Sequence, residues 1–330
     1  MPAPLILGLE GPELTAREAA FFREAAPWGF ILFARNCETP AQLRRLTARL
    51  REAVGREAPV LIDQEGGRVQ RLGPPNWRQH PPALAQAARL GPEGMALRAR
   101  LIAADLRDCG IDAVCAPLGD LLEPGTHPML RSRTYGGEAA GVIACARAVA
   151  EASLAGGVLP VLKHVPGHGR ASADSHHALP RIDAPLESLR ARDFAPFAAL
   201  ADLPMAMTAH VVVEAVDPER PATLSPAVLR LIREEIGLRG LLMTDDISMG
   251  ALSGPIAARG AAALAAGCDV VLHCNGRINE MEALATLGSM SAPVAARAKA
   301  ALAMRRAPEA VDTAALAAQL AALYEAAPSA

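Results

Sequence analysis

The sequence predicts a single (β/α)8 barrel, and three observations support this fold class. Eight short apolar segments alternate with segments of helical periodicity along the 330 residues. The apolar segments are almost continuously hydrophobic, which is typical of parallel strands buried on both faces. Polar residues stand near the ends of these segments, at Asp63, Lys163, His164, His210, Asp245 and Asp246. In a TIM-type barrel all strand carboxyl ends meet on one face, whereas an open sheet would gather these side chains less well.

The predicted elements follow one another in a regular order. In residues 40–54 apolar side chains recur every three or four positions, and the helical pattern of residues 96–110 ends at Gly110. APVLIDQEGG reads as a strand that runs into a glycine-rich loop. We expect strands within residues 5–11, 29–35, 58–67, 112–122, 158–167, 204–213, 240–249 and 269–276. We expect helices within residues 13–27, 40–54, 96–110, 139–157, 225–237 and 255–267, and we expect the alanine-rich residues after 276 to complete the outer shell.

The composition excludes several classes of function. Hydrophobic residues make up 51% and charged residues 21%, which favours a sizeable core over a disordered chain. A net charge of -2 provides no basic surface for nucleic acid. The first residues lack the basic start of a signal peptide, and no apolar run approaches the roughly 18 residues of a membrane span. The six cysteines form no CxxC pair. We therefore expect reduced, buried thiols in a cytoplasmic protein that binds neither nucleic acid nor membrane.

Two strand ends carry candidate polar sites. DQEGGRVQRL (63–72) places Asp63 before two glycines, with Arg68 and Arg71 behind them. A carboxylate and an arginine in this arrangement suit sugar hydroxyls, but an Asp–Arg pair that closes the loop explains the pattern equally well. TDDISM (244–249) places two carboxylates side by side, where burial is costly without partners. One carboxylate is a candidate nucleophile or base, and the other is a candidate helix cap.

The segment KHVPGHGRASADSHHALP holds four of the eight histidines, at positions 164, 168, 176 and 177. Catalytic zinc favours spacings such as HExxH, whereas HVPGH interposes proline and glycine, so we expect no metal. PGHGR also lacks the GxxxxGK[ST] pattern of a phosphate loop. Asp174 stands two residues before His176 and could orient its ring, which makes His176 a candidate general acid and base. We expect a structural role for His168 and weak order over residues 165–178, because small residues impose little packing there.

Taken together, KHxPGHG, the DSH of 174–176, DQEGGRVQR and the TDD strand end resemble the motifs of bacterial β-N-acetylhexosaminidases of glycoside hydrolase family 3. The resemblance extends over about residues 5–280 and implies a nucleophile at Asp245 and an acid/base at His176, oriented by Asp174. It also implies that the sugar is bound by Asp63, Arg71, Arg133, Lys163 and His164. Of these, Arg133 lies in RSRTYGG, which by pattern alone reads as a solvated loop.

Three positions depart from the family pattern. Thr244 stands where serine is more frequent, PLGD ends at Asp120 where PVxD is usual, and His177 stands where lysine is common. None of these departures removes a catalytic group. The roles of Asp120 and His177 stay open at this point.

The resemblance also implies an activity. Family members of the cytoplasmic cell-wall-recycling type remove terminal N-acetylglucosamine from 1,6-anhydro-N-acetylmuramic acid and its peptides, with retention, through a covalent glycosyl-enzyme. Many relatives take the acid from a second domain, for which the residues behind the barrel leave no room. We therefore expect one domain over residues 1–330, with the acid on a barrel loop.

We further expect a monomer that acts on a small-molecule substrate without a cofactor. Three alternatives stay open. One is phosphorolysis with the same Asp–His dyad, and another is a metal-dependent barrel hydrolase that uses His164, His168 and His176. The third is a sugar-binding module without activity, although binding alone would need no nucleophile.

Overall fold

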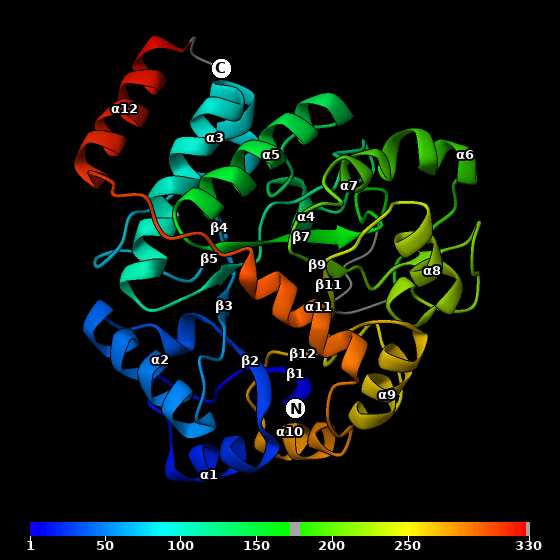
Figure 1. The fold of residues 1–330 in the computed structure, drawn as a ribbon. Helices are drawn as coiled ribbons and strands as arrows, with labels where there is room; N and C mark the ends of the chain where they lie inside the picture. Colours follow the sequence, from blue (N-terminus) through cyan, green and yellow to red (C-terminus); the bar gives the residue numbers. More distant parts are fainter. Residues whose placement is uncertain (172–178, 328–330) are drawn as a thin grey trace.

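The computed structural model of the chain describes residues 1–171 and 179–327 and contains a closed parallel barrel (Figure 1). Each strand pairs in parallel with the next one along the barrel, and the last strand pairs with the first. The predicted (β/α)8 fold is therefore confirmed. The barrel strands are β1 (Ala3–Leu7), β2 (Pro27–Leu32), β3 (Val60–Ile62), β6 (Ala113–Val114), β7 (Leu159–Val165), β9 (Met205–Thr208), β11 (Leu241–Asp246) and β12 (Val270–His273).

Two predicted strands are much shorter than expected, and both deviations shape the carboxyl end of the barrel. The segment predicted within 58–67 leaves the barrel after Ile62, since β4 (Gln64–Gly66) turns back to pair antiparallel with β5 (Val69–Gln70). Gly66 and Gly67 make this turn with φ of 93° and 57°, a region that favours glycine. The hairpin carries the residues of DQEGGRVQR across the end of the barrel.

The segment predicted within 112–122 keeps regular pairing only at β6, because Pro117 has no N–H to donate. Its continuation still runs beside β7. Leu118 bridges Lys163 in parallel, and the N–H of Gly119 donates to the carbonyl of Lys163 at 2.8 Å. Asp120 is thereby held against the carboxyl end of β7.

Helices surround the barrel in the expected positions, and α2 (Pro40–Val54) matches its predicted range. The predicted helix of 96–110 begins earlier, since α3 (Ala83–Asp108) continues across a kink at Gly91. The helical segments between β7 and β9 escaped prediction; they are α6 (Leu186–Ser188), η2 (Leu189–Asp193) and α7 (Ala195–Ala199). The other predicted helices are α1 (Ala16–Ala25), α5 (Ala139–Ala155), α8 (Pro226–Glu234) and α9 (Ile256–Ala266), and there is a short α4 (Pro128–Arg131).

The segment predicted within 204–213 is divided into β9 and β10 (Val212–Val213). β10 pairs outside the barrel with β8 (Arg181–Ile182). Two 3-10 turns, η1 (Ala34–Asn36) and η3 (Ala222–Leu224), complete the connections.

The C-terminal helices have three different positions, so the expected completion of the outer shell is only part of the picture. α10 (Ile278–Ala285) packs beside α9 and α1, as a shell helix would. α11 (Ala292–Ala303) shares a hydrophobic cluster with side chains from the barrel interior, and Arg297 bonds Asp269 just before β12. It therefore closes the amino-terminal end of the barrel. α12 (Thr313–Ala326) lies outside, along α3 (Figure 1).

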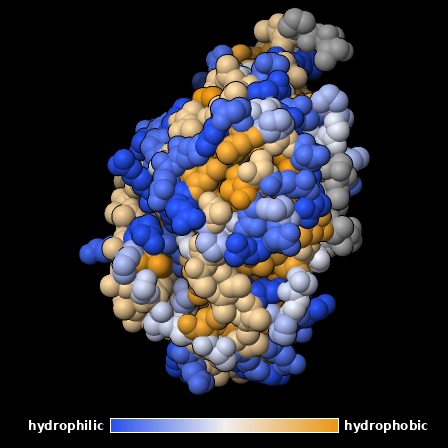
Figure 2. Space-filling model, turned by 90° about the vertical axis from the view of Figure 1, so that its right-hand side faces the viewer, coloured by the Kyte–Doolittle hydropathy of each residue, from blue (hydrophilic) through white to orange (hydrophobic). Residues whose placement is uncertain are grey.

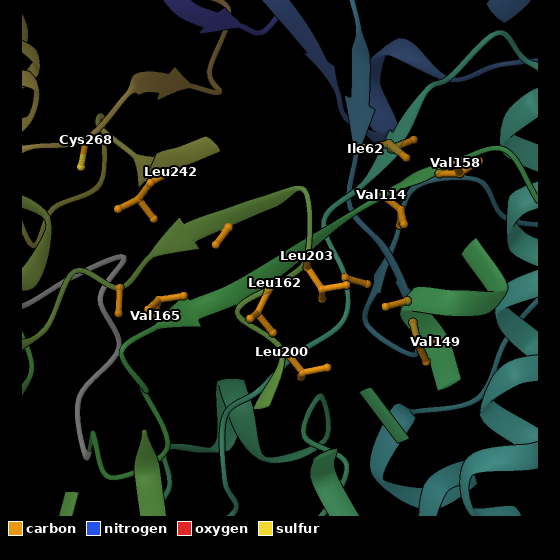
Figure 3. Packing of buried hydrophobic residues seen from close by; sticks show 14 of the residues in the cluster. Ile62, Val114, Val149, Val158, Leu162, Val165, Leu200, Leu203, Leu242 and Cys268 are labelled. Atoms are coloured by element: carbon orange, nitrogen blue, oxygen red, sulfur yellow. The ribbon is translucent and has the colours of Figure 1, made fainter. Parts of the chain in front are cut away.

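The core has two layers. Ile6, Met243 and other inward-pointing strand residues fill the barrel, while alternate residues pack outward against the helices. Figure 3 shows Leu162 of β7 near Leu200 and Leu203, which belong to the same outer cluster. The surface in Figure 2 shows hydrophobic patches among hydrophilic residues. Within the described parts of the chain, no helix has both the length and the apolar character to cross a membrane.

Candidate functional site

A pocket of about 240 Å³ lies at the carboxyl ends of the barrel strands. Six of the eight predicted site residues line it, namely Asp63, Arg71, Arg133, Lys163, His164 and Asp245. The other two, Asp174 and His176, lie outside the described residues. The remaining lining residues are Ile31, Phe33, Arg68, Val69, Met129, Met207, Asp246, Met249, Leu272 and Cys274. A concave site with convergent charged groups and an apolar floor suits a small polar ligand.

A network of alternating charges forms one wall of the pocket, and each of its five members except Glu65 lines the pocket directly. Lys163 Nζ lies 2.8 Å from Asp63 Oδ1 and 2.6 Å from Glu65 Oε1. Glu65 also receives two bonds from Arg133, at 2.8 Å from Nε and 2.8 Å from Nη2. Arg71 Nη2 bonds Asp63 Oδ2 at 3.1 Å. The five side chains hold each other in fixed positions, because buried charges are tolerated only with such partners.

This network keeps its carboxylates ionised. Burial alone would raise the pKa of Glu65, but Arg133 and Lys163 outweigh it and lower the pKa to about 2. Burial likewise opposes ionisation of Asp63, and Lys163 with Arg71 holds its pKa well below the usual range. In turn, burial would lower the pKa of Lys163, but the two carboxylates raise it. At neutral pH the wall therefore presents fixed charges that can donate to and accept from sugar hydroxyls.

His164 is oriented by a buried carboxylate behind it. Its Nδ1 lies 2.7 Å from Asp120 Oδ2, and its backbone N–H donates to the same oxygen at 3.2 Å. The other ring nitrogen, Nε2, lies 3.5 Å from Arg133 Nη2. Burial disfavours the ionised form of Asp120, but interactions with His164 and His168 hold its pKa below the usual value.

The two adjacent carboxylates of TDD have different surroundings. Asp246 holds the turn after β11, since it accepts the N–H groups of Ser248 (3.0 Å) and Cys274 (3.1 Å) and the Ser248 hydroxyl (2.7 Å). Within the described residues, the one hydrogen bond to the Asp245 side chain comes from the N–H of Asp246, at 2.8 Å. Asp245 is thus the carboxylate of this pair that remains available to a ligand.

The charge of Asp245 is also favoured. Burial would raise its pKa, but the neighbouring imidazoles of His164 and His210, together with the N–H of Asp246, hold the pKa below its usual value. His210 is itself anchored, with Nδ1 2.7 Å from Thr223 Oγ1 and Nε2 3.0 Å from the carbonyl of Asp246. Asp245 therefore faces the pocket as a carboxylate on a rigid strand end.

The chain that leaves β7 is firmly packed up to the end of its described part. Residues 165–171 are mostly buried, the Thr126 hydroxyl donates to the carbonyl of Gly169 at 2.6 Å, and the N–H of His127 donates to the carbonyl of Ala171 at 3.2 Å. This packing contradicts the expected weak order for residues 165–171. Residues 172–178, to which the rest of that expectation applied, lie outside the described residues.

His168 belongs to this packed stem. Its backbone N–H donates to Asp120 Oδ1 at 2.7 Å, and its side chain is buried. Burial, followed by repulsion from His164, lowers the pKa of His168 to about 4, so the ring is neutral at neutral pH. These contacts favour the expected structural role. In the part of the chain that the structure describes, no group of three or more His, Cys, Asp or Glu side chains is arranged to hold a metal ion.

Two residues of the site were missed or left open by sequence reasoning. Glu65 stands within DQEGG, but only the fold shows that it joins Lys163 to Arg133. Asp120 was recognised at a strand end without a role, and the structure shows that its partner is His164 in the adjacent strand β7. Arg133, which its loop pattern would place in solvent, is buried with 8% of its surface exposed. The Asp63–Arg71 bond closes the hairpin, as the structural interpretation expects, and both side chains also line the pocket.

Comparison with known proteins gives a consistent picture. The model of the glycosyl hydrolase family 3 N-terminal domain matches residues 16–303. A β-hexosaminidase of Pseudomonas aeruginosa is 39% identical over 292 residues, which cover 87% of each chain. A β-hexosaminidase of Alkalilimnicola ehrlichii is 38% identical over 284 residues, which cover 82% of this chain and 80% of the relative.

Solved structures agree with this assignment. The NagZ of Neisseria gonorrhoeae, in complex with N-trifluoroacetyl-D-glucosamine, superposes with a TM-score of 0.84 at 29% identity and 98% coverage of both chains. A family 3 β-N-acetylglucosaminidase of a Paenibacillus species also has a TM-score of 0.84 at 29% identity, covering 97% of this chain and 67% of its own. The family match over most of the chain confirms the expected enzyme class: the chain belongs to glycosyl hydrolase family 3, and its relatives include β-hexosaminidases.

Proposed function

We propose that the protein is a retaining exo-β-N-acetylglucosaminidase that removes terminal N-acetylglucosamine from 1,6-anhydro-N-acetylmuramic acid and its peptides during cytoplasmic peptidoglycan recycling. The observation that carries the proposal is Asp245, an ionised carboxylate on a rigid strand end that faces a small charged pocket. The complex of the Neisseria NagZ with an N-acylated glucosamine supports the sugar assignment.

In the proposed mechanism, Asp245 attacks the anomeric carbon and displaces the leaving oxygen. This forms a covalent glycosyl-enzyme. Of the three carboxylates that line the pocket, Asp63 is occupied by Lys163 and Arg71, and Asp246 is occupied by the turn after β11. Within the described residues, only Asp245 combines a position in the pocket with a free carboxylate oxygen.

The remaining charged residues hold the sugar in position. Each oxygen of Asp63 is engaged by a cation but keeps a second lone pair that can accept from a sugar hydroxyl, and Lys163, Arg71 and Arg133 can donate to other hydroxyls. Because they already bond one another, little side-chain freedom is lost when the sugar binds. Binding energy is then available to align the anomeric carbon with Asp245.

The proton is assigned to a group outside the described residues. We propose that His176, oriented by Asp174, protonates the leaving oxygen and then activates the water that hydrolyses the intermediate. The proposal for this pair rests on the DSH motif and the family resemblance. The firmly packed stem of residues 165–171 supports it, because it fixes where that segment begins.

The first test is the replacement Asp245→Ala, assayed with an aryl β-N-acetylglucosaminide. Loss of the nucleophile should lower kcat by at least roughly 10³-fold. The matched control Asp108→Ala removes an exposed carboxylate that pairs with Arg44 at the surface, and it should leave kcat unchanged. Near-normal turnover by Asp245→Ala would refute the assignment.

The second test is product analysis with N-acetylglucosaminyl-anhydromuramyl peptides, followed by NMR. Free N-acetylglucosamine that first appears as the β anomer is expected, with or without phosphate. Formation of the sugar 1-phosphate in phosphate buffer would favour phosphorolysis, and loss of activity with a chelator would favour the metal-dependent alternative.

The expected monomer is tested separately, by the molar mass that light scattering gives for the eluted protein.

A further inference from the structure

We propose that Asp120 is a positioning residue of the active site, which acts through His164 by fixing the tautomer and the direction of its imidazole ring. The proposal deepens the proposed function, and it rests on that function only for the sugar as the ligand of His164. Asp120 is 1% exposed and does not line the pocket, whereas His164 does.

The hydrogen-bond pattern determines which ring nitrogen carries the hydrogen. An ionised carboxylate has no hydrogen to donate, and Asp120 Oδ2 lies 2.7 Å from His164 Nδ1. Nδ1 must therefore be the donor. In the neutral ring, Nε2 is then the nitrogen with the free lone pair. Nε2 lies 3.5 Å from Arg133 Nη2. A guanidinium nitrogen can only donate a hydrogen bond, so this neighbour also favours an acceptor at Nε2.

The same carboxylate fixes the backbone around the ring. Oδ2 accepts the N–H of His164 at 3.2 Å, and Oδ1 accepts the N–H of His168 at 2.7 Å. Asp120 is itself held beside β7 by the bond from Gly119 N–H to the carbonyl of Lys163. Three donors converge on one buried carboxylate, so neither the ring nor the chain that carries it can rotate without leaving a buried polar group unpaired.

This arrangement has a functional consequence for the pocket. With Nδ1 committed to Asp120, Nε2 is the nitrogen that His164 can present to a sugar hydroxyl. Removing such an orienting partner typically costs a site about 10- to 100-fold in affinity or activity, as measured for partners of metal ligands. Asparagine in place of Asp120 retains one acceptor oxygen for three donors, and its amide nitrogen cannot accept from the imidazole.

The first measurement uses the wild-type protein and does not depend on any variant. Two-bond 1H–15N NMR spectra of the 15N-histidine-labelled protein, recorded at alkaline pH, report which ring nitrogen of each histidine carries the hydrogen. The spectrum of His164→Gln identifies the signal of His164. The Nδ1–H tautomer is expected, and an Nε2–H tautomer of His164 would overturn the proposal.

The second measurement is a double-mutant cycle on kcat/KM for an aryl β-N-acetylglucosaminide. Asp120→Asn should lower kcat/KM roughly 10- to 100-fold, and it should have less than about a twofold effect in the His164→Gln background. If Asp120→Asn lowers kcat/KM by the same factor in both backgrounds, Asp120 does not act through His164, and the proposal is overturned.

A matched control separates positioning from general folding effects. Asp217 is also a buried aspartate that accepts two backbone N–H groups, those of Glu219 and Arg220, but it is absent from the pocket lining. Asp217→Asn should leave kcat/KM and the His164 signal unchanged. If the proposed substrate is wrong, the role of Asp120 can still be tested by the NMR measurement and by a mutant cycle with any glycoside that the enzyme cleaves. If His164 has the other tautomer, the substrate assignment is not affected.

Discussion

Glu65→Gln is the substitution whose effect the charge network defines most sharply. The change preserves the shape of the side chain but removes its negative charge from between Lys163 and Arg133. The Glu65 carboxylate lies 2.6 Å from the ammonium group of Lys163 and makes two bonds of 2.8 Å to Arg133. Both partners would remain buried with one fewer counter-charge.

The size of the effect follows from the pKa. The folded protein lowers the pKa of Glu65 from 4.5 to about 2, and each pKa unit corresponds to about 1.4 kcal/mol. The carboxylate thus contributes roughly 3 kcal/mol at neutral pH, which agrees with the roughly 3–5 kcal/mol typical for breaking a buried ion pair. We expect Glu65→Gln to lower the free energy of unfolding by about this amount.

The assay is urea unfolding at pH 7, followed by circular dichroism. The matched control is Glu282→Gln, which removes the same charge from the exposed Glu282–Arg17 pair and should cost less than about 1 kcal/mol. The contribution of Glu65 is present above pH 4.5 and is lost as the pH falls towards about 2, because the unfolded carboxyl takes up its proton first. The difference between wild type and Glu65→Gln should shrink over that range. If Glu65→Gln is no more destabilising than Glu282→Gln at pH 7, the account of the network is wrong.

Two further predictions concern the stem of residues 165–171. The difference in the free energy of unfolding between wild type and His168→Gln should decrease by about 3 kcal/mol as the pH falls from 6.5 to about 4, because the unfolded chain accepts a proton on His168 that the buried ring resists. Unfolding curves recorded at several pH values check this. A difference that does not change with pH would contradict it. Gly169→Ala would bring a Cβ to 1.9 Å from the carbonyl oxygen of Leu121 and should lower the free energy of unfolding by about 1–3 kcal/mol. In the control Gly125→Ala the new Cβ has no atom within 4 Å, so the loss should be less than about 0.5 kcal/mol. Equal melting temperatures of the two variants would refute the packing described for the stem.

The barrel could be predicted because its signal is local. Continuous apolar segments such as LLM of β11 are long enough to identify buried parallel strands, and the polar residue after each marks the end that faces the site. The segments between β7 and β9 could not be found in this way. Their helical pieces are of only three to five residues and include a proline at position 196, which is too short for a helical period to emerge.

The residues of the site also fall into those that the local sequence identifies and those that it does not. Asp63, Lys163 and Asp245 stand at strand ends and could be recognised individually. Their partners could not be, since Arg133 lies 68 positions from Glu65 and Lys163 lies 100 positions from Asp63. Such pairs depend on how the fold brings separate loops together. Motif resemblance identified Arg133 despite its loop pattern, but it provided no role for Glu65 or Asp120.

The most direct test of the central claim is to trap the glycosyl-enzyme. When a fluorinated N-acetylglucosaminyl fluoride is the substrate, hydrolysis of the glycosyl-enzyme should be slower than its formation. The glycosyl-enzyme then accumulates, and mass spectrometry detects the protein with one sugar attached. Peptide mapping is expected to place the sugar on Asp245, and the adduct should be absent from Asp245→Ala. A sugar attached to another residue, or an α-anomeric first product without any adduct, would contradict the proposed mechanism.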